Sequence, residues 1–441
     1  MNKNLLFATV VSALGSFLFG FDTAVISGTT KYITGYFNLT EASLGFTVSI
    51  ALWGTVIGSI SVGKPGDIFG RKKILFVCSL MYLVSSFGCA LAGDWTVLLV
   101  SRFIGGIAIG AASVMSPMYI AEIAPGRLRG RLVAVAQFNI VVGILAAFFS
   151  NYLLSGLGEY SWRWMFGIMS VPSLLFFAFL FIVPESPRWL VKKGRMNEAD
   201  SVLSKLGSEK SGMELNAIVA SLDEEKGGNA LKLFQKKYSF SIICAVLLAV
   251  FNQLSGINVI MYYAPMIFEK AGASIDAALM QAIFVGVTNL LFTIIAMFFI
   301  DKFGRKTLLL IGAVGMSLSL AGAGLHYYYE NIFTQVWILV FIISFIAFFA
   351  FSQGAVIWVF LAEVFPNKVR AKGQALGSFV HWIMNAVIGL VFPITLAEFG
   401  GGMIFMFFAV MMVPFFFFVW KIMPETKGKS LEELEKVLVK E

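Results

Sequence analysis

The sequence predicts an all-α membrane protein, with twelve transmembrane helices in two pseudo-symmetric six-helix bundles and a cytoplasmic helical linker between them. Of the 441 residues, 59% are hydrophobic and 13% are charged, and the mean hydropathy is +0.85. A soluble domain carries about 25% charged residues. Short motifs also recur along the chain at one nearly constant offset. The composition therefore predicts a polytopic membrane protein, and the recurring motifs predict a duplicated one.

Apolar segments long enough to cross ~30 Å of hydrocarbon occur throughout the chain. The predicted spans are 5–27, 43–63, 74–92, 96–121, 132–154, 164–183, 239–267, 277–300, 307–325, 335–362, 373–395 and 402–422. The predicted parts are a first bundle (1–183), a linker (184–238), a second bundle (239–423) and a cytoplasmic tail (424–441). The first span follows the N-terminus without a signal-peptide cleavage pattern, so we expect it to be retained. Within the linker, apolar spacing predicts helices over 197–206 and 214–222.

Lysines and arginines concentrate in the loops that follow even-numbered spans. Those loops hold Lys64, Arg71, Lys72, Lys73, Arg127, Arg129, Arg131, Lys302, Arg305, Lys306, Lys368, Arg370 and Lys372. Loops after odd-numbered spans hold only Lys31, Arg163 and Lys270. The positive-inside rule therefore places the even loops, the linker and both termini in the cytoplasm. We expect a multi-pass protein of the cell membrane, surrounded by the lipid bilayer.

Three motifs occur twice, in the same order. Asp67-x-x-Gly-Arg-Lys recurs from Asp301, Ala121-Glu-x-x-Pro recurs from Ala362, and Pro184-Glu recurs from Pro424. The offsets are 234, 241 and 240 residues. Six spans return the chain to its starting side, so the two halves are related by an axis along the membrane normal. A substrate site is then expected at mid-depth between them.

Charge and cysteine content exclude several function classes. The net charge of +8 is segregated into loops, which indicates membrane orientation and not nucleic-acid binding. The three cysteines, Cys78, Cys89 and Cys244, lie inside apolar runs without metal-ligand spacing, so we interpret them as packing residues. The sequence contains neither a nucleophile–base–acid cluster nor a phosphate-binding loop. We therefore expect no enzyme activity, no cofactor and no metal.

In the seventh span, the apolar run FNQLSGINVIMYYAP over 251–265 is interrupted by the uncharged polar residues Asn252, Gln253, Ser255 and Asn258. Their spacing predicts one shared helix face for Asn252, Ser255, Asn258 and Tyr262, with Gln253 beside it. Burying an amide in hydrocarbon without a partner costs several kcal/mol, roughly. The face is therefore expected either to line a polar cavity or to bond neighbouring helices.

Asp22 and Arg102 are the chief fixed charges inside the spans. At ~1.5 Å per residue, Asp22 near the end of span one and Arg102 near the start of span four lie at similar depth. We expect them to pair. Protonation of Asp22 would release Arg102 and change the packing of the two spans, which is the functional interpretation. The alternative is a static ion pair that fixes helix packing.

Charged residues also gather at the predicted cytoplasmic ends of the spans, at equivalent positions in both halves. These candidate gate residues are Asp67, Arg71, Glu122, Arg129, Glu185, Arg188, Arg305, Glu363, Arg370 and Glu425. Exposed ion pairs contribute only ~0.2 to 1 kcal/mol each, which suits a latch that must open. The alternative interpretation is a set of static loop contacts and topology determinants.

Five motifs together resemble the sugar porter branch of the major facilitator superfamily over nearly the whole chain. They are Gly63-x-x-x-Asp67-x-x-Gly-Arg-Lys72, Arg102 with Gly105, Gly106 and Gly110, Pro184-Glu-Ser-Pro-Arg-Trp189, Gln253-Leu-Ser-Gly-Ile-Asn258 and Pro424-Glu-Thr-Lys-Gly428. The resemblance implies alternating access and a monosaccharide substrate. Asp22 matches the proton-coupled bacterial xylose and glucose symporters of this family, whereas animal facilitative carriers have asparagine there. Symport with a proton is therefore favoured over uniport.

The resemblance also implies which residues surround the sugar. The substrate-binding candidates are Gln137, Gln253, Asn258, Trp358, Asn385, Asn252, His381 and Gly354, with Phe19, Tyr262 and Trp382 as walls. Four positions depart from the family pattern, namely Asn252, Ile144, Ala355 and His381. Ile144 resembles glucose carriers, so a hexose such as glucose or galactose is favoured over a pentose such as xylose or arabinose. His381 replaces an amide, either as a neutral hydrogen-bonding ring or as a pH sensor.

The expected partners are thus a monosaccharide, a proton and the lipid bilayer, with no nucleic acid, and we expect the chain to act as a monomer. The alternatives are a facilitative sugar uniporter and a drug/proton antiporter of the same superfamily. An antiporter would share the Asp67–Lys72 motif but not the Pro184–Trp189 stretch.

Overall fold

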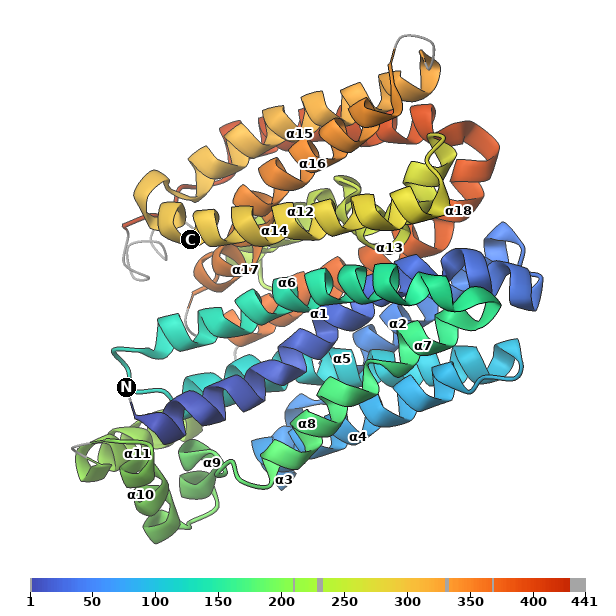
Figure 1. Ribbon diagram of the computed structural model, residues 1–441. Coiled ribbons are helices and arrows are strands. Elements are labelled where there is room, and N and C mark those ends of the chain that lie inside the picture. Colours follow the sequence, from blue (N-terminus) through green and yellow to red (C-terminus); the bar gives the residue numbers. More distant parts are fainter. Residues whose placement is uncertain (1, 209–210, 228–232, 330–332, 367–368, 429–441) are drawn as a thin grey trace. The chain divides into compact units, whose positions relative to one another are not determined.

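The computed structural model describes residues 2–208, 211–227, 233–329, 333–366 and 369–428, and in these ranges it contains helices and no strands. Figure 1 shows the helices along the chain. The α-helices are α1 (Lys3–Phe37), α2 (Glu41–Ser61), α3 (Gly63–Phe69), α4 (Arg71–Ala90), α5 (Trp95–Ile123), α6 (Arg129–Leu154), α7 (Ser161–Gly167), α8 (Ser170–Leu180), α9 (Pro187–Lys192), α10 (Met196–Lys205), α11 (Ser211–Gly227), α12 (Ser239–Leu254), α13 (Ile257–Lys270), α14 (Ile275–Phe303), α15 (Arg305–Tyr328), α16 (Gln335–Phe351), α17 (Gln353–Glu363) and α18 (Arg370–Phe417). Two 3₁₀ turns, Ser155–Tyr160 and Lys236–Tyr238, and a π-helical turn, Phe418–Ile422, complete the elements. Lys368 and the tail beyond residue 428 lie outside the described residues.

Ten helical stretches of the described chain are long and apolar enough to cross a membrane. Two of them, Arg129–Leu180 and Arg370–Ile422, contain 52 and 53 residues. A single crossing needs about 20 residues, so each of these stretches is long enough for two spans. Gly158 (φ 83°) and Gly400 (φ 72°) have non-helical backbone and interrupt the two stretches. Divided there, the stretches supply the twelve predicted spans.

The chain forms two compact units. The first comprises Met1–Asp22, Trp53–Ile144 and Arg163–Ala230, and the second comprises Thr23–Leu52, Leu145–Trp162 and Leu231–Glu441. The second unit thus contains the second sequence repeat together with one end of α1, α2 and α6. The boundaries predicted at residues 183, 238 and 423 remain a prediction.

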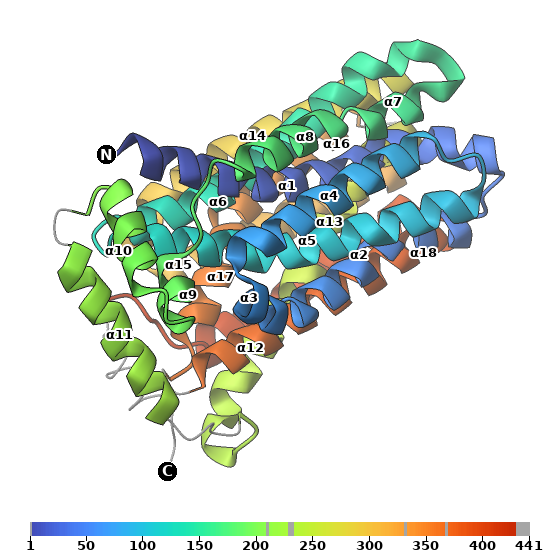
Figure 2. The same cartoon turned by 90° about the horizontal axis from the view of Figure 1, so that it is seen from below.

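In the first unit, α4 packs against α5 and α8, and the linker helices α9, α10 and α11 pack together (Figures 1 and 2). Trp189, Leu190 and Ala199 form the buried core of this helical linker. The linker helices predicted over 197–206 and 214–222 are confirmed as α10 and α11. Their apolar residues, spaced by three and four, face this core.

In the second unit, α15 lies alongside α16 and α18, and α12 also packs against α18 (Figure 1). All three cysteines of the chain are free and buried. The prediction that they are packing residues is therefore confirmed.

Candidate functional site

The polar run of the seventh predicted span is divided between two helices of the second unit. Gly256 has a left-handed backbone (φ 82°, ψ 9°), so α12 ends at Leu254 and α13 begins at Ile257. A side chain at position 256 would also be strained, because an added Cβ would lie 2.6 Å from the ring of Phe408. The predicted single helix face for Asn252, Ser255, Asn258 and Tyr262 is therefore wrong. A spacing count assumes a continuous helix, and the helix is interrupted between the second and third of these residues.

The interruption nevertheless brings the predicted amides together around Gln253. The side-chain nitrogen of Gln253 donates to Oδ1 of Asn252 at 3.0 Å and lies 3.2 Å from Nδ1 of His381 on α18. Asn258 Nδ2 donates to Oε1 of Gln253 at 2.8 Å. Farther along, Asn385 Nδ2 donates to the hydroxyl of Tyr262 at 2.9 Å. These residues come from α12, α13 and α18, so three helices build one polar cluster.

Two buried atoms of this cluster have no hydrogen-bond partner among the described residues, Nδ2 of Asn252 and Oδ1 of Asn385. Their residues are only 2% and 1% exposed. Leaving such a group unsatisfied costs about 1 to 3 kcal/mol. One of the two atoms is a donor and the other is an acceptor, and hydroxyl groups can satisfy both kinds. The cluster is therefore incomplete in a way that a polyhydroxylated ligand would complete.

Aromatic rings adjoin the cluster. The rings of Trp358 and His381 are 5.0 Å apart, and those of His381 and Trp382 are 5.3 Å apart. Trp358 is 37% exposed, whereas Trp382 is buried. An indole face suits the apolar C–H face of a sugar ring. Gly354 lies on α17, one turn before Trp358.

The remaining substrate-binding candidates, Gln137 on α6 and Phe19 on α1, are half-buried in the first unit. Ile144, the position taken to favour a hexose, is buried on the same α6. Their participation in a sugar site with the second-unit cluster remains a prediction.

The predicted pairing of Asp22 with Arg102 is confirmed. Within the first unit, Nη1 of Arg102 lies 2.8 Å from Oδ1 of Asp22, and the two side chains are each 3% exposed. The guanidinium group also lies over the ring of Phe166, 5.7 Å from its centroid. In the part of the chain that the structure describes, buried Arg102 Nε has no partner. Loss of the carboxylate charge would therefore leave a buried cation without its counter-ion, which is costly.

A charge network lies in the first unit where α3, α4, α5 and the start of the linker meet. Arg71 donates to Asp67 at 3.0 Å and to Glu122 at 2.9 Å. Glu185 Oε1 accepts from the backbone nitrogens of Arg71, Lys72 and Ser186 at 3.1, 3.1 and 2.8 Å. Burial raises the pKa of Glu185, although these backbone bonds act in the opposite direction.

The second unit repeats this network at equivalent positions. Arg305 donates to Asp301 at 2.9 Å and to Glu363 at 2.8 Å, and Glu425 accepts from the backbone nitrogen of Arg305 at 3.1 Å. Gly70 and Gly304 both have positive φ, 99° and 89°, and an added Cβ would meet Glu185 or Glu425 within 2.8 Å. The sequence prediction that these charges occupy equivalent positions is confirmed.

Two hydroxyl groups that complete these networks were missed by the sequence analysis. Ser186 Oγ donates to Glu122, and Thr426 Oγ1 donates to Glu363 at 2.6 Å. The two residues are separated by 240 residues, the offset already found for Pro184 and Pro424. Extending that repeat by two residues would have identified them.

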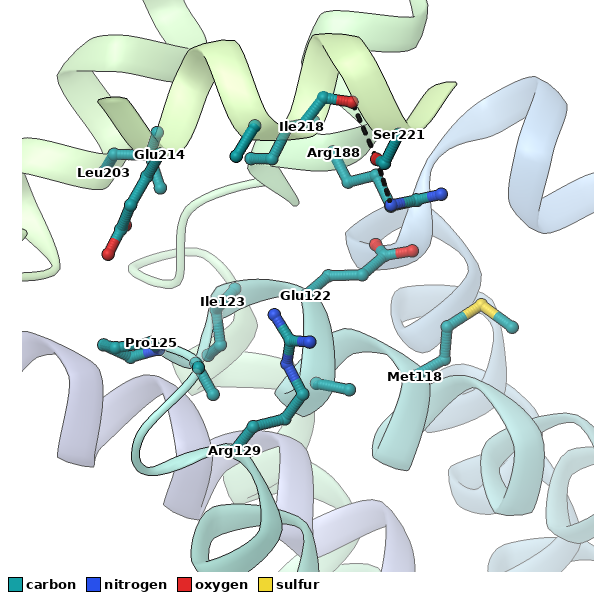
Figure 3. A pocket seen from close by; sticks show the side chains of 14 residues that line it. Met118, Glu122, Ile123, Pro125, Arg129, Arg188, Leu203, Glu214, Ile218 and Ser221 are labelled. Carbon is teal, nitrogen blue, oxygen red and sulfur yellow. Dashed lines mark hydrogen bonds between the residues drawn. The ribbon is translucent and has the colours of Figure 1, made fainter. Parts of the chain in front are cut away.

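Arg129 and Arg188 line a cavity of about 570 Å³ in the first unit (Figure 3). Figure 3 shows the side chain of Glu122 between those of Arg129 and Arg188. Arg188 donates to Ser221 of α11 at 3.1 Å, and Ser221 donates to the carbonyl of Ile218 at 2.8 Å. In the second unit, Arg370 donates to the carbonyl of Phe365 at 3.3 Å. The gate candidates are thus grouped within each unit, and their role as a latch between the bundles remains a prediction.

Comparison with known proteins decides the family. The family model described as "Sugar (and other) transporter" matches residues 8–438. The chain belongs to this sugar transporter family. It is 39% identical to the D-xylose-proton symporter of Escherichia coli strain K12, an alignment that covers 98% of this chain and 96% of the symporter. It is 38% identical to the arabinose-proton symporter of Bacillus subtilis strain 168, covering 97% and 94% of the two chains.

Solved structures support the same assignment. The structure is similar to that of the xylose transporter XylE from E. coli in a partially occluded inward-open conformation, with a TM-score of 0.87 and 36% identity. The similarity covers 97% of this chain and 100% of the XylE chain. The sugar transporter is accordingly a multi-pass membrane protein with the twelve-helix fold of the major facilitator superfamily. Among the described residues, no group of three metal-ligating side chains lies close enough to hold a metal ion.

Proposed function

We propose that this sugar porter imports a monosaccharide together with a proton by alternating access of its two six-helix bundles. The observation that carries the proposal is the buried amide cluster around Gln253, in which Asn252 Nδ2 and Asn385 Oδ1 lack partners. Hydroxyl groups of a sugar would supply the missing acceptor and donor. The rings of Trp358 and Trp382 adjoin His381 and would cover the apolar face of the sugar.

Proton coupling is assigned to Asp22 and Arg102. Their contact at 2.8 Å joins α1 to α5, and both side chains are buried. A proton that binds Asp22 neutralises the counter-ion of Arg102, so the packing of these two helices must change. One proton moving down 100 mV releases ~2.3 kcal/mol, which is enough to accumulate sugar by tens of fold. The symporter names of the relatives support coupling, and facilitative uniport is the second candidate.

The substrate preference within the monosaccharides rests on opposing observations. Ile144 favours a hexose by resemblance to glucose carriers, whereas the two relatives named above carry D-xylose and arabinose in their names. Asn252 and His381 are the departures from the family pattern, and His381 directly contacts Gln253. We assign these two residues to the choice of sugar.

The proposal extends to the placement of the protein in the membrane. Both termini and the linker face the cytoplasm of the cell membrane, according to the distribution of lysine and arginine. The charge networks of Arg71 and Arg305 lie at that face, and the protein acts as a monomer with residues 1–183 and 239–423 as its bundles. Rocking of the bundles would bring Arg129 and Arg370 toward the opposite half as an inner latch.

Uptake into proteoliposomes tests this function. Labelled glucose, xylose and galactose are offered with and without an inward proton gradient, and each is competed with the other sugars and with a lipophilic cation. Saturable sugar uptake that the gradient drives uphill is the expected result. Uptake that only equilibrates would establish uniport, and competition by the lipophilic cation alone would favour the drug antiporter.

A further inference from the structure

An ion pair joins the first helix of one sequence repeat to the first span of the other. Nζ of Lys31 on α1 lies 2.6 Å from Oε2 of Glu269 on α13. Both residues belong to the second compact unit, which contains one end of α1 together with the second repeat. They also lie at the ends of their helices that the charge distribution places outside the cell. The same distribution places Arg305, which follows the next span of the second repeat, at the opposite, cytoplasmic end of that repeat.

Two hydrogen bonds next to this ion pair each stay within one repeat. Tyr32, the residue after Lys31, donates to the carbonyl of Ser155 at 3.3 Å, and both residues belong to the first repeat. Gln335 donates to the carbonyl of Gly272 at 2.6 Å, and both belong to the second. These bonds can therefore remain intact when the outer ends of the two repeats separate. The Lys31–Glu269 contact is different, because it must break whenever the outer ends of α1 and α13 move apart.

We propose that Lys31 and Glu269 form an outer clasp, a reversible ion pair that favours the state in which the outer ends of α1 and α13 are together. The clasp rests on the proposed alternating-access function, in which a sugar enters from outside when these ends separate. Lys31 and Glu269 are positioning residues, since they act on the helix ends and are not part of the amide cluster around Gln253.

The exposure of the two side chains sets the strength of the clasp. The Lys31 side chain is 58% exposed and that of Glu269 is 22% exposed, so water and salt screen the pair. Exposed pairs of this kind change an equilibrium by about 1.4- to 5-fold. Such a clasp biases the closed state without preventing opening, and it must weaken as the ionic strength rises toward 1 M, where the Debye length falls to ~3 Å.

The distance between the two helix ends can be measured by double electron–electron resonance on the full-length protein in nanodiscs. Spin labels are attached at Gly35→Cys on α1 and Ala273→Cys after α13. The native Cys78, Cys89 and Cys244 are buried, so they give little background labelling. A side chain added at Gly35 meets no atom within 4 Å, so the label does not disturb α1.

Glu269→Gln and Lys31→Gln should each lower the ratio of near to far distances by about 1.4- to 5-fold, and the double variant should add nothing further. Exchanging the charges, Lys31→Glu with Glu269→Lys, should restore the ratio. High salt should lower the ratio in the unmodified pair and leave the Lys31→Gln protein unchanged. The matched control is Glu198→Gln, which removes the exposed Arg195–Glu198 pair in the linker and should have no effect.

Unchanged distance distributions in both single variants, or a charge exchange that behaves like the single variants, would overturn the clasp. Sugar counterflow in the same preparations reports separately on transport. Loss of counterflow in the unmodified protein would refute the proposed function, while a salt-sensitive distance ratio would still support the clasp. A variant that fails to fold is replaced by the salt titration of the unmodified protein, in which a constant ratio would equally overturn the proposal.

Discussion

Replacing Gly45 with alanine should hold one end of α2 away from α18. Both residues at this contact, Gly45 and Leu390, belong to the second compact unit. A Cβ at position 45 would lie 2.1 Å from the backbone oxygen of Leu390, and an ordinary contact requires at least 3.4 Å. Leu390 O is part of the α18 backbone, so it cannot rotate away as a flexible side chain would. The two helices must therefore separate by more than about 1 Å.

Overpacking of this kind costs about 1 to 3 kcal/mol. If only the state with α2 and α18 in contact carries this cost, its population relative to the separated state should fall by about 5- to 150-fold. The spin-label pair at positions 35 and 273 would report the change as a larger fraction of far distances. Sugar counterflow should also slow, because exchange requires both states.

Gly212→Ala on α11 is the matched control, because an added Cβ there meets nothing within 4 Å. Both substitutions gain about 1 kcal/mol of helix propensity, so this term cancels in the comparison. Equal distance distributions and equal counterflow rates for the two variants would refute the reasoning that the Gly45–Leu390 contact limits separation.

Three further substitutions test the other assignments. Asp22→Asn should preserve counterflow and abolish uphill uptake, with a lowered melting temperature because Arg102 loses its counter-ion; concentrative uptake in this variant would contradict the coupling role. Glu185→Gln should keep the acceptor atom Oε1 and melt near the wild type at pH 8, whereas Glu185→Ala should lose about 1 to 3 kcal/mol of stability. Burial raises the pKa of Glu185, so the folded state binds a proton at this carboxyl more tightly than the unfolded state does. The wild type should therefore gain stability relative to Glu185→Gln as the pH falls from 8 to 5. Melting temperatures of the two proteins that change in parallel with pH would argue against this. Asn385→Ala should weaken sugar binding by about 5- to 150-fold in calorimetric titration, whereas Asn139→Ala, which removes an amide bonded within its own helix, should not.

The membrane spans were predictable because the hydropathy and length of an apolar segment can be read directly from the local sequence. The pairing of Asp22 with Arg102 was also predictable, because the rise per residue of a helix fixes the depth of each side chain. The contact at 2.8 Å also requires that α1 and α5 be neighbours, which depth alone does not give.

The residues of the polar cluster around Gln253 were predicted, but their geometry was not. Spacings of three and four imply one face only while the helix continues, and no hydropathy pattern reports that Gly256 adopts a left-handed backbone. The hydrogen bond from Asn258 to Gln253 crosses this break, so it could not be derived from the spacing. For the same reason, the closeness of His381 to Gln253 required the packing of α18 on α12.

Comparison of equivalent positions in the two repeats indicates how proton coupling and sugar recognition are distributed between them. At offsets of 234 to 241, Asp22 corresponds to residues 256–263 and Arg102 to residues 336–343. The first of these segments contains Asn258 and Tyr262 and no carboxylate, and the second contains only Val, Trp, Ile, Leu and Phe. The charge networks around Arg71 and Arg305 are nearly identical in the two repeats. The mid-span polar groups differ, with an ion pair in the first repeat and uncharged amides in the second. Because these groups differ where the rest of the repeat is maintained, we infer that proton coupling is specialised in the first repeat and most sugar recognition in the second. Substitutions at Asp22 should then change coupling without changing the choice of sugar, and substitutions around Gln253 should do the reverse.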